Sequence, residues 1–165
     1  MRRLIIALAG VLILIVANVG IYQKQQLVDS GRVVLLELAP VDPRSLMQGD
    51  FMALRFRVAD VAFGSVDRGA LQDGRLVLTL DERNVGKFTR FDSGEPLGPG
   101  EVLIRYRVRG GTPKFATNAF FFEEGTADAY ARARFGEFRV SPSGDAILVR
   151  MRGEKFEVLG PIEHR

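Results

Sequence analysis

Apolar residues are distributed unevenly along the chain, and their longest run extends from Leu4 to Tyr22 with only Asn18 as an interruption. At about 1.5 Å of rise per residue, ~19 residues of helix reach ~28 Å, close to the ~30 Å hydrocarbon core of a bilayer. No other stretch of the sequence is long and apolar enough to cross a membrane as a helix. The run therefore predicts a transmembrane helix over residues 4–22.

A cleaved signal peptide and a buried core helix are the alternatives for this run. Signal peptides have a shorter apolar region, of about 7–15 residues, and small residues before the cleavage site. Cleavage after Ala17 would place Ile15 three positions before the cut, and cleavage after Gly20 would place Asn18 there, so both sites fit poorly. A core helix would show a polar face, and the run has none before Asn18. We therefore interpret the run as an uncleaved anchor.

The charges that flank the run predict its orientation. Arg2 and Arg3 precede it, and Lys24 is the only cation close behind it. Because positive charge stays on the cytoplasmic side, the body of the chain is expected outside the cytoplasm. The predicted organisation is a cytoplasmic stub at 1–3, an anchor at 4–22, a linker at 23–32 and an extracytoplasmic domain at 33–165.

Beyond the anchor, apolar and polar residues alternate with the two-residue period of half-buried strands. In the segment 51–58, Met52, Leu54, Phe56 and Val58 share one face, and the arginines belong to the other. The predicted strands are 33–38, 51–58, 75–80, 87–91, 102–108, 138–140, 146–151 and 155–159. Residues 126–135 are alanine-rich and form the only good helix candidate outside the anchor.

Turn signals separate these strands. The segment 39–49 contains two prolines and ends at Gly49, which predicts a short helical turn there. Further turns are expected at 71–74, 81–84, 97–100 and 141–145. Many short strands with few helices predict a mainly β fold: an N-terminal transmembrane helix followed by an antiparallel β sandwich or barrel-like domain with one short α-helix.

The net charge changes meaning once the anchor is separated. The chain carries 23 basic and 20 acidic residues, a formal charge of +3. Without Arg2 and Arg3 the remainder has 21 basic and 20 acidic residues, and so is nearly neutral. A nucleic-acid-binding domain needs a basic surplus on one face, so the sequence argues against nucleic acid as a partner.

Few residues are available for catalysis or for metal binding. The sequence has no cysteine, and its one histidine is His164, next to the last residue, which disfavours Ser-His and Cys-His catalysis and a zinc site. The acidic pairs at 81–82 and 123–124 lack further acidic residues nearby, so a solvated surface is the better interpretation than calcium binding. We expect no metal and no cofactor, and an enzyme is less expected than a binding protein.

Residues 40–56, PVDPRSLMQGDFMALRF, resemble the signature of the GDYXXLXY family of bacterial membrane-anchored proteins. The segment from Phe121 to Arg134, F-x-x-E-G followed by alanines, also matches. The resemblance implies a bacterial envelope location and association with a multi-spanning membrane protein, and it implies no particular activity. Phe51 and Phe56 replace the usual tyrosines. The signature positions are Gly49, Asp50, Phe51, Leu54 and Phe56.

The signature has two interpretations, as a turn-and-strand junction needed for folding or as a binding site. Asp50 is able to accept backbone N–H bonds or to pair with Arg44. A binding site would use Arg44, Asp50, Arg55 and Glu123, and it requires these residues to converge in one cleft. Signal-peptidase-like chemistry would need a serine with a lysine base. Ser45 is available in this segment, but nothing in the sequence pairs a lysine with it.

Three consecutive phenylalanines, at 120–122, follow Phe115. Because they cannot all face one side of a strand, we expect Phe120 and Phe122 in the core and Phe121 packed under the helix. The alternative is an exposed patch that contacts lipid, a cell-wall component or a partner. The function expected from the sequence is a non-catalytic binding or assembly module for an integral membrane partner; a small-ligand or envelope-component binder and an unrecognised hydrolase remain the alternatives.

Overall fold

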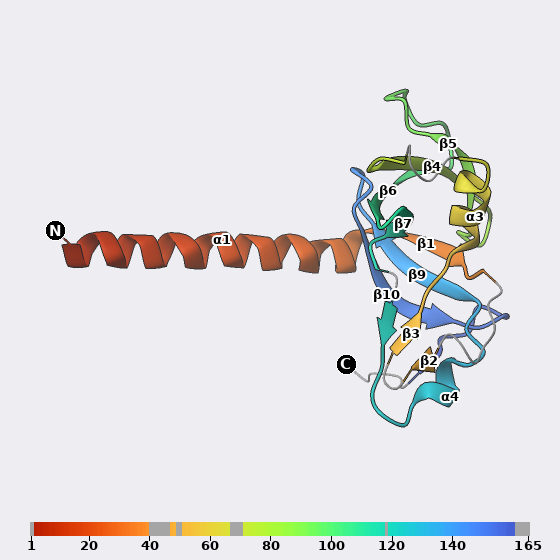
Figure 1. Cartoon of the computed structure of the whole chain (residues 1–165). Coiled ribbons are helices and arrows are strands. Elements are labelled where there is room, and N and C mark those ends of the chain that lie inside the picture. Colours follow the sequence, from red (N-terminus) through yellow and green to blue (C-terminus); the bar gives the residue numbers. More distant parts are fainter. Residues whose placement is uncertain (1, 40–46, 49–50, 67–70, 118, 161–165) are drawn as a thin grey trace.

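The fold consists of one long helix and a β domain (Figure 1), which a computed structural model describes for residues 2–39, 47–48, 51–66, 71–117 and 119–160. Helix α1 extends from Arg2 to Ser30 and projects from one side of the domain. Within it, Leu8–Ser30 is long and apolar enough to cross a membrane, and none of this span is buried. Residues 23–30, which we assigned to a linker, continue the helix.

The described strands form three antiparallel sheets. The first sheet has the order β1-β9-β10, the second β5-β4-β6-β7 and the third β2-β3-β8. The strands are β1 Arg32–Glu37, β2 Met47–Gln48, β3 Phe51–Ala53, β4 Gly74–Leu80, β5 Gly86–Phe91, β6 Glu101–Arg109, β7 Thr112–Phe115, β8 Ala119–Phe121, β9 Phe135–Val140 and β10 Ala146–Arg152. The prediction of a mainly β, antiparallel domain after an apolar helix is confirmed.

One hydrophobic core joins the sheets. Leu36 of β1, Leu76 of β4, Ile104 of β6 and Phe138 of β9 are all fully buried, and they belong to one cluster. Burying a side chain of this size contributes about 1.5–3 kcal/mol to folding. Phe115 also lies in this cluster, with an exposed fraction of 1%.

The predicted strand 51–58 is wrong in its second half. Strand β3 ends at Ala53, Phe56 makes an isolated antiparallel bridge with Leu38, and the short helix α3 covers Arg57–Phe63. Asp60 lies in the first turn of α3, where its negative charge interacts favourably with the positive end of the helix dipole. The Phe63 ring packs on Tyr106 at 4.8 Å between centroids, which holds the helix on the second sheet.

The alternation of burial over this segment is nevertheless as predicted. Met52, Leu54, Phe56 and Val58 are 2–6% exposed, whereas Arg55 is exposed. Whether a side chain is buried depends on the direction in which it points. The alternation therefore persists although the residues do not all belong to one hydrogen-bonded strand.

Helix α4 is shorter than predicted, covering Ala127–Tyr130 where the sequence suggested 126–135. The reason is that Arg134 already pairs with other strands: its N–H donates to the Arg152 carbonyl and its carbonyl accepts the Leu38 N–H, both at 2.8 Å. The predicted strand 155–159 is also absent. Val158 makes only an isolated bridge with Arg152.

Candidate functional site

A cavity of about 520 Å³ lies between β3, α3 and β7, and we call it the α3 cavity. Leu54 and Phe56, two positions of the family signature, line it together with Phe63 and Phe115. Its volume is within the range of about 300–1,000 Å³ that is usual for small-ligand sites.

Charged side chains of both signs line the α3 cavity. The Arg55 Nη2 atom lies 3.1 Å from the Asp60 Oδ1 atom, and Lys114 of β7 is also among the lining residues. The Arg55 and Asp60 side chains are 64% and 50% exposed, so their ion pair contributes less than about 1 kcal/mol to stability. An apolar cavity with weakly paired charges can bind an amphiphilic molecule, and a charged ligand would exchange with this ion pair at little cost.

Two of the four site residues proposed from the sequence, Arg55 and Glu123, are among the described residues, and they lie in different surroundings. Arg55 belongs to the α3 cavity, whereas Glu123 follows β8 and is not among the described residues that line the cavity. Arg44 and Asp50 lie outside the described residues, as do Gly49 and Ser45. Asp60 and Lys114 were not found from the sequence, because their positions depend on α3 and β7, which the sequence pattern did not predict.

Glu123 has a local role at the start of α4. Its carbonyl accepts hydrogen bonds from the N–H of Thr126 at 3.1 Å and from the Thr126 hydroxyl at 2.7 Å. Burial raises the pKa of the Tyr130 hydroxyl above its usual value, and the charge of Glu123 raises it further. Glu123 therefore stabilises the turn before α4 through its main-chain carbonyl.

The three consecutive phenylalanines separate into two environments. Phe120 and Phe122 pack on the buried Tyr130, with ring centroids 5.0 and 5.3 Å away. Phe121 is 73% exposed, so the expectation that it packs under the helix is wrong. Its ring lies 5.9 Å from that of the half-buried Phe51, and we call this pair the Phe51–Phe121 patch.

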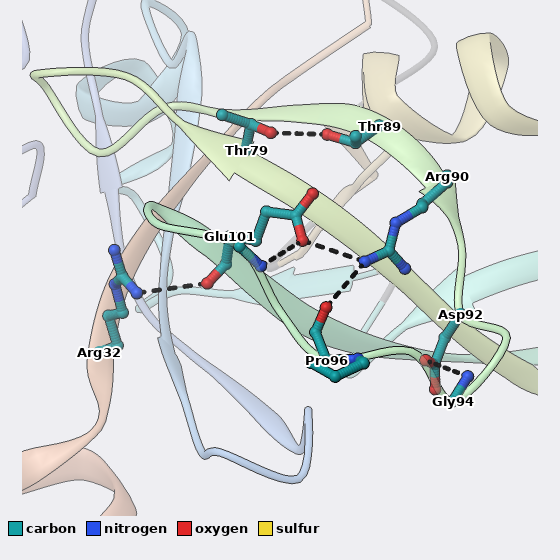
Figure 2. A network of polar contacts seen from close by, with 9 residues as sticks. Arg32, Thr79, Thr89, Arg90, Asp92, Gly94, Pro96 and Glu101 are labelled. Atoms are coloured by element: carbon teal, nitrogen blue, oxygen red, sulfur yellow. Dashed lines mark hydrogen bonds and ion pairs between the residues drawn. The ribbon is translucent and has the colours of Figure 1, made fainter.

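A network of polar contacts centred on Glu101 lies near the end of α1 (Figure 2). The Glu101 Oε2 atom is 3.1 Å from Arg90 Nη2, and it accepts the Gly98 N–H at 2.9 Å. Arg90 also donates to the Pro96 carbonyl at 3.4 Å, and Arg32 donates to the Glu101 carbonyl at 3.4 Å. This network holds the loop between β5 and β6 against the start of β6.

In the same loop, Asp92 accepts the Gly94 N–H at 3.0 Å and pairs with Arg75 Nε at 2.7 Å. These interactions hold the pKa of the Asp92 carboxyl below its usual value, with the backbone N–H of Gly94 as the largest cause. The Asp92 carboxylate is therefore already paired within the protein.

A second cavity, of about 600 Å³, lies where α1 meets the domain, and we call it the junction cavity. One of its walls is α1, and the other contains Leu97, Glu101 and Pro142. The Arg139 guanidinium donates to the Gly31 carbonyl at 3.1 Å, which ties the end of α1 to β9. Helix and domain are therefore joined by packing and hydrogen bonds as well as by the backbone.

These observations define a mainly β domain carried on one exposed apolar helix. Residues 13–151 match the family model described as GDYXXLXY protein, and the chain belongs to this family. The match covers most of α1 and the residues that line the α3 cavity. Comparisons with curated proteins and with solved structures gave no significant match.

Proposed function

We propose that this protein is a non-catalytic binding or assembly module of the bacterial inner membrane, with an integral membrane protein as its partner. In this proposal α1 is a permanent anchor, and the β domain lies on the periplasmic side. The apolar surface of α1, which is exposed along its whole candidate span, supports the membrane location. Arg2 and Arg3 before the span support the orientation.

The observation that carries the proposal is the joint between α1 and β1. Only Gly31 separates the end of the helix at Ser30 from the first strand at Arg32, and its carbonyl is held by Arg139. An ideal Cβ at Gly31 would clash with the Leu27 carbonyl oxygen, so this close approach favours glycine. A domain fixed in this way presents a constant surface at a constant height above the bilayer, which raises its effective concentration beside a membrane partner.

The Phe51–Phe121 patch is the surface that we assign to the partner. Phe121 has the largest exposed fraction of the large apolar side chains described in the β domain, and it belongs to β8 at the edge of the third sheet. Aromatic side chains, phenylalanine among them, are enriched in the buried cores of protein interfaces.

Site-specific photo-crosslinking in native membranes tests this assignment. A photoreactive phenylalanine analogue at position 121 should yield one dominant adduct with an integral membrane protein. The same analogue at Val61, which is 63% exposed on α3, is the control and should not yield this adduct. Equal labelling from both positions, or no protein adduct from position 121, would contradict the proposal.

The contribution of the anchor is tested separately. Replacement of residues 4–22 by an unrelated apolar helix of equal length should weaken the position-121 adduct if the helix sequence contributes to partner contact. An unchanged adduct would assign the whole contact to the β domain and leave α1 as a tether. A reporter fused after the β domain, active only in the periplasm, tests the orientation.

A small-ligand site in the α3 cavity is the second candidate function. The cavity has a suitable volume and is lined by two signature residues and by Arg55. Native mass spectrometry of the purified chain should then detect a bound small molecule, and Ala59→Trp, which places an indole in the cavity wall, should remove it. Detection of the same molecule on both proteins would assign it to another surface.

A further inference from the structure

The junction cavity has a wall formed by one face of α1. The α1 residues that line it are Gln23, Gln26, Leu27 and Ser30. They follow the spacing i, i+3, i+4 and i+7, which places them on the same side of a helix. The opposite wall contains Leu97, Val102, Leu103 and Pro142, so the cavity combines apolar walls with amide and hydroxyl groups.

The height of this cavity relative to the bilayer follows from the sequence of α1. Gln23 comes directly after Tyr22, where the apolar run ends. From Gln23 to Ser30 the helix rises about 10 Å, and the headgroup layer of one leaflet is about 5–8 Å thick. If α1 spans the membrane as proposed above, the cavity opens at the height of the lipid headgroups.

The charges of the cavity favour an anion. Arg32 and Glu101 are the ionisable residues among its described lining, and the Glu101 carboxylate is already paired with Arg90 (Figure 2). Among the described residues, the exposed Arg32 makes one long hydrogen bond, of 3.4 Å, to a main-chain carbonyl. A guanidinium has five N–H donors, so Arg32 keeps donors for a phosphate group.

Two carbonyls near the C-terminal end of α1, where the helix dipole is negative, are engaged within the protein: Gly31 N–H donates to the Leu27 carbonyl at 2.9 Å, and the Ser30 hydroxyl donates to the Gln26 carbonyl at 2.7 Å. Arg139 adds a second cation beside the helix end through its bond to the Gly31 carbonyl.

From this arrangement we propose that the junction cavity binds an anionic phospholipid of the leaflet that faces the β domain. Arg32, at the end of the cavity farthest from the hydrocarbon core, pairs with the lipid phosphate. Leu27 and Leu97 contact the glycerol, and Gln23 and Gln26, nearer the core, supply amide groups to the ester oxygens of the acyl chains. The lipid fills the space between anchor and domain and adds to the contacts that hold the two together. This site depends on the proposed membrane location and is independent of the Phe51–Phe121 patch.

The test uses the full chain in nanodiscs of phosphatidylcholine with a minor fraction of photoreactive phosphatidylglycerol. Labelling should map to residues of the junction cavity. Arg32→Gln should reduce it about tenfold, as expected for the loss of a charge-assisted hydrogen bond to phosphate. The control is Lys24→Gln, because Lys24 is a second cation near the membrane surface, level with Gln23 at the other end of the cavity, but it lines a shallow groove on another face of the helix. The control should change labelling less than about twofold.

A second variant, Leu97→Asp, places a carboxylate in the cavity wall without changing α1 and should also reduce labelling. Equal loss from Arg32→Gln and Lys24→Gln would indicate general attraction of anionic lipid and overturn the site. Labelling that maps elsewhere on the chain would overturn it too. Failure of the full chain to co-elute with nanodiscs would instead contradict the membrane location in the proposed function, so the two failures are distinguishable.

Discussion

Phe51 and Phe121 lie opposite each other in the β3–β8 ladder, and their ring centroids are 5.9 Å apart. The next pair in the register, Met52 with Phe120, points to the core, because successive side chains alternate between the two faces. The register of this short ladder therefore decides which of the consecutive phenylalanines is exposed. The Phe51–Phe121 pair joins a family-signature position to the F-x-x-E-G segment, although about 70 residues separate them in the sequence.

Substitution of Phe121 should separate binding from stability. Phe121→Ser should change the free energy of unfolding by less than about 1 kcal/mol, because the side chain is 73% exposed. Phe115→Ala should cost about 3–5 kcal/mol, because Phe115 is 1% exposed and its loss leaves a cavity in the core. Chemical denaturation of both variants in detergent measures the two values. A large loss of stability in Phe121→Ser would show that the patch is structural.

Glu137 is the buried charged residue among those described, with an exposed fraction of 2%. Its carboxylate lies 2.5 Å from Arg152 Nε and 3.8 Å from Arg150 Nε, on β10. Glu137→Gln keeps the shape and removes the charge, so both arginines lose their anionic partner. The free energy of unfolding should fall by about 1–3 kcal/mol.

The control for this substitution is Glu37→Gln. Glu37 pairs with Arg57 at 3.2 Å, and both side chains are more than 40% exposed, so its loss should cost less than about 1 kcal/mol. Denaturation curves of the two variants under the same conditions give the comparison. If both variants lose the same free energy of unfolding, burial does not strengthen the ion pairs of Glu137 with Arg150 and Arg152.

Much of the fold was predictable, because hydrophobic periodicity reports burial. The strands at 33–38, 75–80 and 102–108 are present within one or two residues. Helix α3 was missed because Val58, Ala62 and Phe63 are buried at a spacing that a strand can also produce in part. The contact of Phe63 with Tyr106 stabilises the helix, and such a long-range contact is not visible in the local pattern.

The candidate site was less predictable than the fold. Arg55 was identified next to the signature, but its partner Asp60 is brought to it by the first turn of α3. The junction cavity was missed for a similar reason: residues 23–30 were assigned to a linker, and their helical continuation forms one of its walls. In both cases the site depends on how two elements pack together.

Gly144 is required in the turn between β9 and β10 for two physical reasons. Its φ angle is +88°, and an ideal Cβ would lie 3.2 Å from the Leu103 Cβ and 3.3 Å from the Arg105 nitrogen. Gly144→Ala should therefore lower the free energy of unfolding by about 1–3 kcal/mol or more, through backbone strain and crowding against β6.

Gly94→Ala separates these two causes. Gly94 has a similar φ of +86°, but no described heavy atom lies within 4 Å of its ideal Cβ. This variant should show the backbone strain alone and a smaller loss of stability than Gly144→Ala. Equal melting temperatures for the two variants would show that contact with β6 is unimportant.

Asp81 should make stability depend on pH below about 4. Its Oδ1 atom accepts the N–H groups of Arg83 and Val85, both at 2.9 Å, and the same turn presents the Asn84 carbonyl to the Leu35 N–H at 2.8 Å. The pKa of the Asp81 carboxyl is lowered, with the Val85 N–H as the largest cause. A folded-state pKa below the unfolded value of about 3.9 means that the folded protein binds the proton less readily.

The contribution of Asp81 is therefore present above pH ~4 and is lost as the pH falls through the lowered folded-state pKa. Asp81→Asn should reduce stability at neutral pH and flatten its decline in acid, as measured by denaturation at a series of pH values. Glu82→Gln is the matched control, because it removes a carboxylate from the same turn and leaves both bonds of Asp81 in place. If the two variants flatten the loss of stability in acid equally, the loss depends on the number of carboxylates and not on the hydrogen bonds that Asp81 makes in the turn. If only Asp81→Asn does so, the acid sensitivity of the first sheet depends on the turn that covers Leu35.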